Sequence, residues 1–211
     1  MTDRAAVAEP YASREQQRDA AVMGMFVFLA TEIMLFGGLF AVALVLRIMH
    51  PREVVEASKH LHIWIGAINT AVLLTSSLGV ALAVHAAHAG ARRTVVWLLA
   101  GAAVLGLSFL GIKAFEYSRE YAEGMLPAFN VPGRFSNPVE HLFMNLYLIS
   151  TALHAVHVSI GVVLLGAVST GTARGWLRLP DRAIVVETSG LYWHLVDAIW
   201  VFLYPVLYLA R

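Results

Sequence analysis

Two ionisable residues near the end of the chain stand where they could do chemistry inside a membrane. His194 and Asp197 lie in residues 187–209, ETSGLYWHLVDAIWVFLYPVLYL, a stretch long and apolar enough to cross a bilayer. On a helix, residues three apart share one face. Lipid tolerates neither side chain without a partner, so each is expected to have one.

A third ionisable residue, Glu32, stands alone in the apolar run FLATEIMLFGG. A carboxyl group at that depth must be neutral or partnered, because an unpaired buried charge is costly. Two interpretations stay open. Glu32 is either a proton-linked or lipid-contacting carboxyl group, or a structural acid that hydrogen-bonds a neighbouring subunit.

Two histidines, His154 and His157, lie three residues apart in a further apolar stretch. Paired histidines can ligate a metal or a haem. However, H-x-x-H within a helix is a loose pattern, and the chain offers no clear carboxylate partner for a closed metal site. We therefore expect packing histidines, with a His154–His194 hydrogen bond as an alternative.

Two further sets of polar residues have structural interpretations. Asn69 shares a helical face with Ser76, which predicts hydrogen bonds and close packing between helices. Lys113 and Glu116, three apart, predict an ion pair whose side chains extend outward toward the membrane surface.

The elements that must position these residues are helices. Of 211 residues, 59% are hydrophobic and only 14% are charged, where a soluble domain has about a quarter. We predict an all-α membrane protein, a bundle of five transmembrane helices in a single domain over residues 1–211. A polar tail occupies residues 1–20, and the helices cover about 23–48, 63–87, 94–115, 141–168 and 191–210.

Positively charged residues beside the helices indicate the orientation. With the N-terminus inside, the cytoplasmic segments carry Arg4, Arg14, Arg18, Arg92, Arg93, Arg174, Arg178 and Arg182, and the opposite side carries Arg47, Arg52, Lys59, Arg119, Arg134 and Arg211. This bias of eight to six predicts a cytoplasmic N-terminus and an outside C-terminus.

Composition also excludes several classes of site. The chain has no cysteine, so disulfides, thiolate metal sites, covalent haem attachment and cysteine-ligated copper are excluded. No basic block points to nucleic acid as a partner.

Five sequence blocks resemble one known family. They are GMFVFLATEIMLFGGLF, NTAVLLTSS, the AFEY that contains Glu116, TALHAVHVSIG and YWHLVDAIWVFLY. In order and spacing they are similar to subunit III of haem-copper terminal oxidases, in its short five-helix bacterial form. Glu32 falls on that family's carbodiimide-reactive glutamate, and Ala152 departs where the family often has glycine.

The resemblance implies a non-redox subunit of a cytochrome c oxidase complex in the bacterial inner membrane. Such a subunit packs against subunit I, accompanies subunit II, binds structural phospholipid and supports proton uptake. Haem and copper belong to the partner subunits, and cytochrome c or quinol donates the electrons. Glu32 is the proton- or lipid-linked candidate, whereas the structural candidates are Asn69, Glu116, His154, His157, His194 and Asp197.

Four alternatives remain open. Two are close relatives in function: subunit III of a quinol oxidase, and a subunit-III-like accessory protein of a nitric oxide reductase. A third is a b-type cytochrome with His154, His157 or His194 as axial ligands. The fourth is a proton-coupled transporter using Glu32 and Asp197, which five helices without inverted repeats disfavour.

Overall fold

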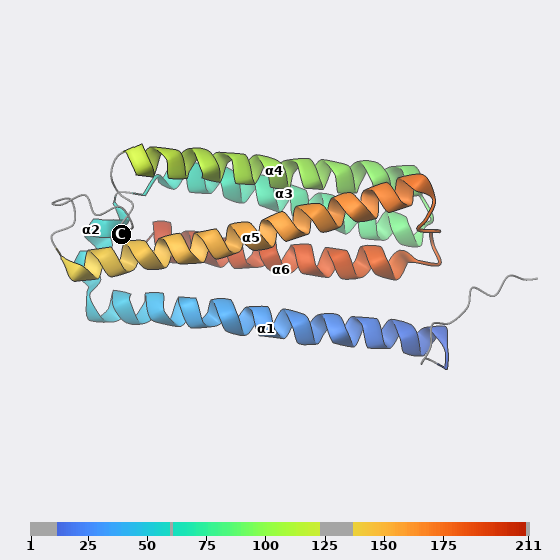
Figure 1. Cartoon of the computed structure of the whole chain (residues 1–211), viewed down its shortest axis with the longest axis horizontal. Coiled ribbons are helices and arrows are strands. Elements are labelled where there is room, and N and C mark those ends of the chain that lie inside the picture. The colour runs from blue at the N-terminus through green and yellow to red at the C-terminus, as the bar shows by residue number, and fades with distance from the viewer. Residues whose placement is uncertain (1–11, 60, 123–136, 210–211) are drawn as a thin grey trace, which may run out of the picture.

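The computed structural model describes residues 12–59, 61–122 and 137–209, and the described part contains six helices and no strand (Figure 1). The helices are α1 (Arg14–Met49), α2 (Pro51–Ser58), α3 (Ile63–His88), α4 (Arg92–Ala122), α5 (Pro138–Arg174) and α6 (Ala183–Tyr208). Five of them, all but α2, are long and apolar enough to cross a membrane. The predicted all-α fold with five candidate spans is confirmed.

The helices extend beyond the predicted bounds except at the end of α6, which was predicted at residue 210 and lies at Tyr208. α1 begins at Arg14, inside the predicted polar tail, where Ser13 caps it by accepting a hydrogen bond from the Gln16 amide at 3.1 Å. α4 continues to Ala122, and α6 begins at Ala183. The prediction followed apolar residues and so stopped at the bilayer edge, whereas polar residues continue a helix into water.

The short helix α2 is absent from the prediction. It begins at Pro51, whose fixed φ suits the first position of a helix. At eight residues it is too short for a hydropathy pattern to show. Between α4 and α5, residues 123–136 lie outside the described residues.

Four helices form a bundle and one lies beside it. Around the bundle the neighbours follow the order α3, α4, α5, α6, and α6 closes the ring against α3. α1 packs mainly on α6 and less on α5, and it is the outer helix in Figure 1. α2 lies against α5 at the end of the bundle where α1 ends.

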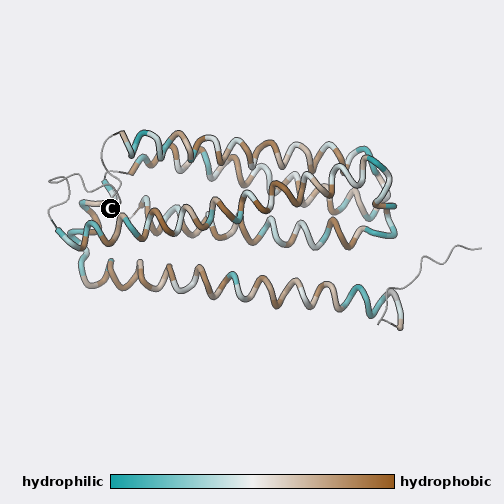
Figure 2. Tube along the Cα trace, viewed as in Figure 1, coloured by the Kyte–Doolittle hydropathy of each residue, from teal (hydrophilic) through white to brown (hydrophobic). Residues whose placement is uncertain are grey.

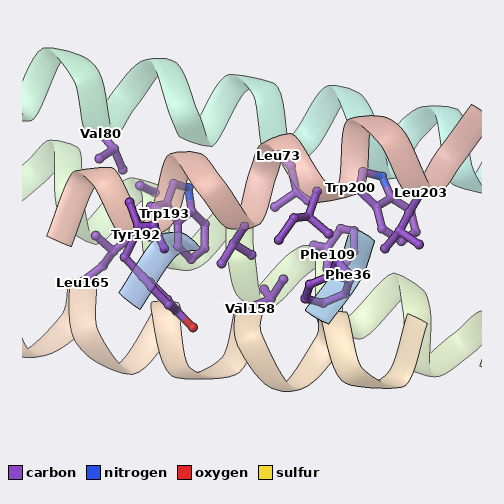
Figure 3. Close-up of a cluster of buried hydrophobic side chains, with 14 of the residues drawn as sticks. Phe36, Leu73, Val80, Phe109, Val158, Leu165, Tyr192, Trp193, Trp200 and Leu203 are labelled. Carbon is purple, nitrogen blue, oxygen red and sulfur yellow. The ribbon is translucent and has the colours of Figure 1, made fainter. Parts of the chain in front are cut away.

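Trp193 of α6 is buried and lies in the cluster of apolar side chains between the helices (Figure 3). A Cβ added at Gly106 on α4 would lie 2.7 Å from the Trp193 ring, and one added at Gly161 on α5 would also lie 2.7 Å from it. The two glycines therefore make room for the indole, since the interior of a protein is close-packed.

The outer surface of the bundle is apolar. Polar residues gather at the two ends, while apolar residues run along the helices between them (Figure 2). Large side chains such as Met34 on α1, Trp97 on α4 and Val163 on α5 are more than 70% exposed. A protein in water rarely exposes so much apolar surface, so the outer face suits lipid or partner helices.

Candidate functional site

Glu32 on α1 and His157 on α5 form an ionisable pair near the middle of both helices. His157 Nε2 lies 2.8 Å from Glu32 Oε2, and the other ring nitrogen, Nδ1, lies 2.8 Å from the Leu153 carbonyl oxygen. The two side chains are only 14% and 11% exposed. This chain itself supplies a partner for Glu32, and a bond from Glu32 to a neighbouring subunit stays a prediction.

Aromatic rings enclose this pair on the bundle side. Phe36 lies edge-on to the His157 ring with centroids 5.3 Å apart. Tyr192 on α6 donates a hydrogen bond from its hydroxyl to the His157 carbonyl at 3.1 Å, and Phe28 stacks on Tyr192. The pair therefore joins α1 to α5 at a place where α6 also meets both helices.

His154 has a different environment from His157. Its side chain is fully buried, its ring stacks on Trp200 with centroids 5.2 Å apart, and Phe109 meets it edge-on at 5.6 Å. Within the described residues neither ring nitrogen has a hydrogen-bond partner. The alternative of a His154–His194 bond is wrong, because α5 brings His154 to the level of Trp200, almost two turns further along α6.

His194 instead bonds to α3. Its Nδ1 lies 2.6 Å from Ser77 Oγ. Asp197 is 6% exposed and also lies near enough to interact with Ser77, while its Oδ1 has no hydrogen-bond partner among the described residues. The shared face predicted for His194 and Asp197 therefore points to α3.

A second ionic site, the Lys113 cluster, lies toward the end of the bundle near α2. We define it as Lys113, Glu116 and Glu120 of α4, Tyr147 of α5 and Tyr208 of α6. Lys113 Nζ donates to Glu116 Oε2 at 2.8 Å and to the Tyr208 hydroxyl at 2.6 Å. Tyr208 donates to Glu116 Oε1 at 2.9 Å, and Tyr147 donates to Glu120 Oε1 at 2.8 Å.

The predicted Lys113–Glu116 ion pair is confirmed, but its outward direction is wrong. The two side chains are 2% and 1% exposed. Four aromatic rings, those of Tyr117, Tyr147, Trp200 and Tyr208, lie with centroids 5.2 to 5.3 Å from Lys113 Nζ. The face of α4 that carries Lys113 points into the bundle, and the rings and hydroxyls there replace the water that an outward side chain would reach.

The hydrogen bonds between helices that were predicted for Asn69 and Ser76 on α3 are present for Ser76 but not, among the described residues, for Asn69. Ser76 donates from Oγ to the Ala102 carbonyl of α4 at 3.0 Å, which is the predicted kind of bond between helices. Trp200 Nε1 donates to Thr70 Oγ1 at 3.1 Å. Asn69 is fully buried, yet neither atom of its amide has a hydrogen-bond partner within the described part of the chain.

Sequence analysis missed several residues of these sites. The hydroxyl of Tyr208 joins Lys113 to Glu116, and Ser77 bonds His194. Neither Tyr208 nor Ser77 was predicted as a site residue. The only signal was a polar atom in an apolar run, which many residues share. Which hydroxyl meets which charge depends on how the helices pack.

The histidines of these sites are placed to bind protons and to join helices, and not to ligate a metal. Both nitrogens of His157 are engaged, and Nδ1 of His194 bonds Ser77. In the described ranges no three His, Cys, Asp or Glu side chains gather as a metal would require. An axial haem role for His154 would also require displacing Trp200 or Phe109 from the ring it contacts.

Comparison with known proteins points to one family. Residues 13–210 match the family model of cytochrome c oxidase subunit III. A cytochrome c oxidase subunit 3 of Thermostichus vulcanus is 30% identical over 90% of this chain and 88% of its own length. A probable quinol oxidase subunit 3 of Staphylococcus epidermidis is 28% identical over 93% and 92% of the two chains. A cytochrome bo(3) ubiquinol oxidase subunit 3 of Pseudomonas aeruginosa is 26% identical over 89% and 84%.

Proposed function

The chain belongs to the cytochrome c oxidase subunit III family, and on this premise we propose that it is the non-redox subunit III of a bacterial haem-copper oxygen reductase. The complex is an oxidoreductase of the inner membrane that passes electrons from cytochrome c or quinol to oxygen. The single observation that carries this proposal is the family match over residues 13–210, which include all five candidate spans.

In this role the whole chain, residues 1–211, acts as one transmembrane domain with its N-terminus in the cytoplasm. It packs against subunit I, accompanies subunit II, and stabilises the complex during turnover. Haem and copper reside in those partners. The exposed apolar faces of α1 and α5 support packing in a membrane assembly.

Phospholipid binding has one supporting feature beyond the family. A groove of about 650 Å³ lies where α1 meets α6, lined by Arg18, Asp19, Val22, Met23, Phe26, Val27, Ala30 and Glu187. Its apolar wall suits an acyl chain, and its polar end carries Arg18 beside Asp19 and Glu187. Exchange of Val27 for Trp is expected to reduce the phospholipid that mass spectrometry detects in the purified chain.

Each candidate residue has a place in this proposal. Glu32, bonded to His157, is the proton-linked group. Asn69, Glu116, His154, His194 and Asp197 are structural, because each lies buried or bonded between helices.

Gentle purification of the tagged chain tests the proposal. The eluate is analysed for partner subunits, for its optical spectrum and for oxygen consumption. Co-purified large subunits with haem bands and oxygen uptake are expected. A haem band on the chain alone would contradict the non-redox role, and a chain that co-purifies with a nitric oxide reductase would favour the accessory alternative.

The electron donor needs its own measurement. The relatives include both a cytochrome c oxidase subunit and quinol oxidase subunits, so a quinol oxidase is the second candidate. Oxygen uptake by the purified complex with reduced cytochrome c, compared with uptake with a quinol, separates the two.

A further inference from the structure

The hydrogen bonds of His157 fix where one of its protons resides. Nδ1 lies 2.8 Å from the Leu153 carbonyl oxygen, and a carbonyl oxygen only accepts. Nδ1 therefore carries a proton. In a neutral imidazole the other nitrogen, Nε2, is then an acceptor without a proton.

This tautomer determines what Glu32 must be. The 2.8 Å contact between His157 Nε2 and Glu32 Oε2 needs one proton between the two atoms. Either a neutral carboxyl group donates it to the neutral ring, or a positively charged ring donates it to a carboxylate. Both states hold the same single proton, and both have zero net charge.

Removal of that proton breaks the contact. The carboxylate would then face the lone pair of Nε2, so two acceptors would meet at hydrogen-bond distance with no proton between them. One uncompensated negative charge would also remain near the middle of two membrane-spanning helices, where it is costly. Addition of a second proton keeps a donor on Nε2 and so preserves the contact.

We propose that Glu32 and His157 form a one-proton binding site that holds α1 against α5, and that loss of the proton releases α1. α1 is the outer helix. Among the bundle helices, it packs mainly on α6 and α5. Polar contacts from α1 to the bundle include this pair, the shorter of the two, and the Arg18–Glu187 contact of 3.7 Å. The proposal stands independently of the oxidase function.

The other titratable groups around the Glu32–His157 pair do not take part in the single proton that the pair shares. Tyr192 on α6 faces Glu32, and its hydroxyl is a donor to the His157 carbonyl. His154 on α5 is electrostatically coupled to His157 and to Lys113 of α4. α1 adds Phe36, which is not titratable. Only Glu32 and His157 share the proton between α1 and α5.

Spin labels can report the position of α1, because the chain has no cysteine of its own. Gly24→Cys on α1 and Gly166→Cys on α5 place labels where an added Cβ meets nothing within 4 Å. Pulsed electron paramagnetic resonance on the full chain in lipid nanodiscs then measures the distance between the labels. At neutral pH we expect one narrow distance, and at alkaline pH a second, longer population that becomes the major one.

Glu32→Gln is the matched control. The glutamine amide donates to Nε2 with no titratable proton, so the narrow distance should persist at every pH. His157→Phe removes the bond and should give the second population already at neutral pH. Persistence of the alkaline change in Glu32→Gln would overturn the proposal, as would a wild-type distance that does not change with pH.

Nitrogen-15 NMR of histidine-labelled, unsubstituted chain tests the same proposal without a folding risk. We expect His157 to carry a proton on Nδ1 at neutral pH, with its signal identified by its loss in His157→Phe. A ring protonated on Nε2 alone would overturn the proposal, because that neutral tautomer already donates from Nε2 to an ionised Glu32 and the contact then survives without the additional titratable proton.

Discussion

The Lys113 cluster and the Glu32–His157 pair both place a carboxyl group against a basic side chain inside the helices, but they differ in enclosure. Lys113 and Glu116 are at most 2% exposed, and the Tyr208 hydroxyl bonds both of them. Glu32 and His157 make a single bond to one another and keep 14% and 11% of their side chains exposed. The cluster joins three helices of the bundle, whereas the pair joins the bundle to its outer helix.

This difference in enclosure indicates that the Lys113 cluster is structural, whereas the Glu32–His157 pair can change its protonation state. Breaking one contact of the cluster leaves a buried charge with its other partners still in place, so the cluster holds α4, α5 and α6 in one arrangement. The pair depends on one proton, and its loss removes the whole contact. The following predictions test this contrast, in order of decreasing effect.

Lys113→Met is expected to have the largest effect. It leaves Glu116 buried without its positive partner, which costs about 3–5 kcal/mol in measured cases. Unfolding by dodecyl sulfate in mixed micelles should show this loss. Lys59→Met is the matched control: Lys59 bonds Glu56 at 2.7 Å with the same spacing, but both are more than half exposed, so a loss of about 1 kcal/mol or less is expected. Equal losses would show that burial does not distinguish the cluster.

Tyr208→Phe tests the hydroxyl that joins the two charged groups of the cluster. It removes bonds to Lys113 and Glu116, and hydrogen bonds to charged groups contribute about 1.5–3 kcal/mol. Tyr204→Phe, four residues earlier, removes only a 3.4 Å contact to the Ile63 carbonyl. In the same unfolding assay Tyr204→Phe should cost clearly less, and a reversed order would contradict the role given to Tyr208.

Gly161→Ala tests whether apolar packing between the two sites matters as much as their polar bonds. The added methyl group would lie 2.7 Å from the Trp193 ring, and such overpacking costs about 1–3 kcal/mol. Gly166→Ala on the same helix meets nothing within 4 Å and should stabilise α5 by up to about 1 kcal/mol. Thermal unfolding of the two variants should therefore move in opposite directions.

Ser77→Ala should have the smallest effect. It removes the bond to the half-buried His194 and the interaction with Asp197, and hydrogen bonds between transmembrane helices average about 0.6 kcal/mol each. Thr75→Ala is the control, since Thr75 bonds only the Ala71 carbonyl of its own helix. A loss as large as that of Lys113→Met would mean that the bonds of one hydroxyl can fix the helices as strongly as the enclosed cluster.

The sequence predicted the existence and order of the five long helices, because a run of about twenty apolar residues that crosses a bilayer satisfies its backbone polar groups by forming a helix. It was less accurate at their ends. α1 starts at Arg14 and α4 runs to Ala122, since polar residues continue a helix where hydropathy gives no signal. It also predicted that Lys113 and Glu116 would meet, because spacing along one helix fixes that contact.

Contacts between helices required the tertiary structure. The sequence places Glu32 and His157 at similar depths but 125 residues apart, and many helix orders are compatible with its apolar runs. Only the packing of α1 beside α5 and α6 brings Glu32 to His157, turns Lys113 inward to Tyr208, and leaves His154 against Trp200 instead of His194. Residue type and depth in the membrane thus follow from the sequence, whereas partners across helices depend on helix rotation and order, which the packing of side chains decides.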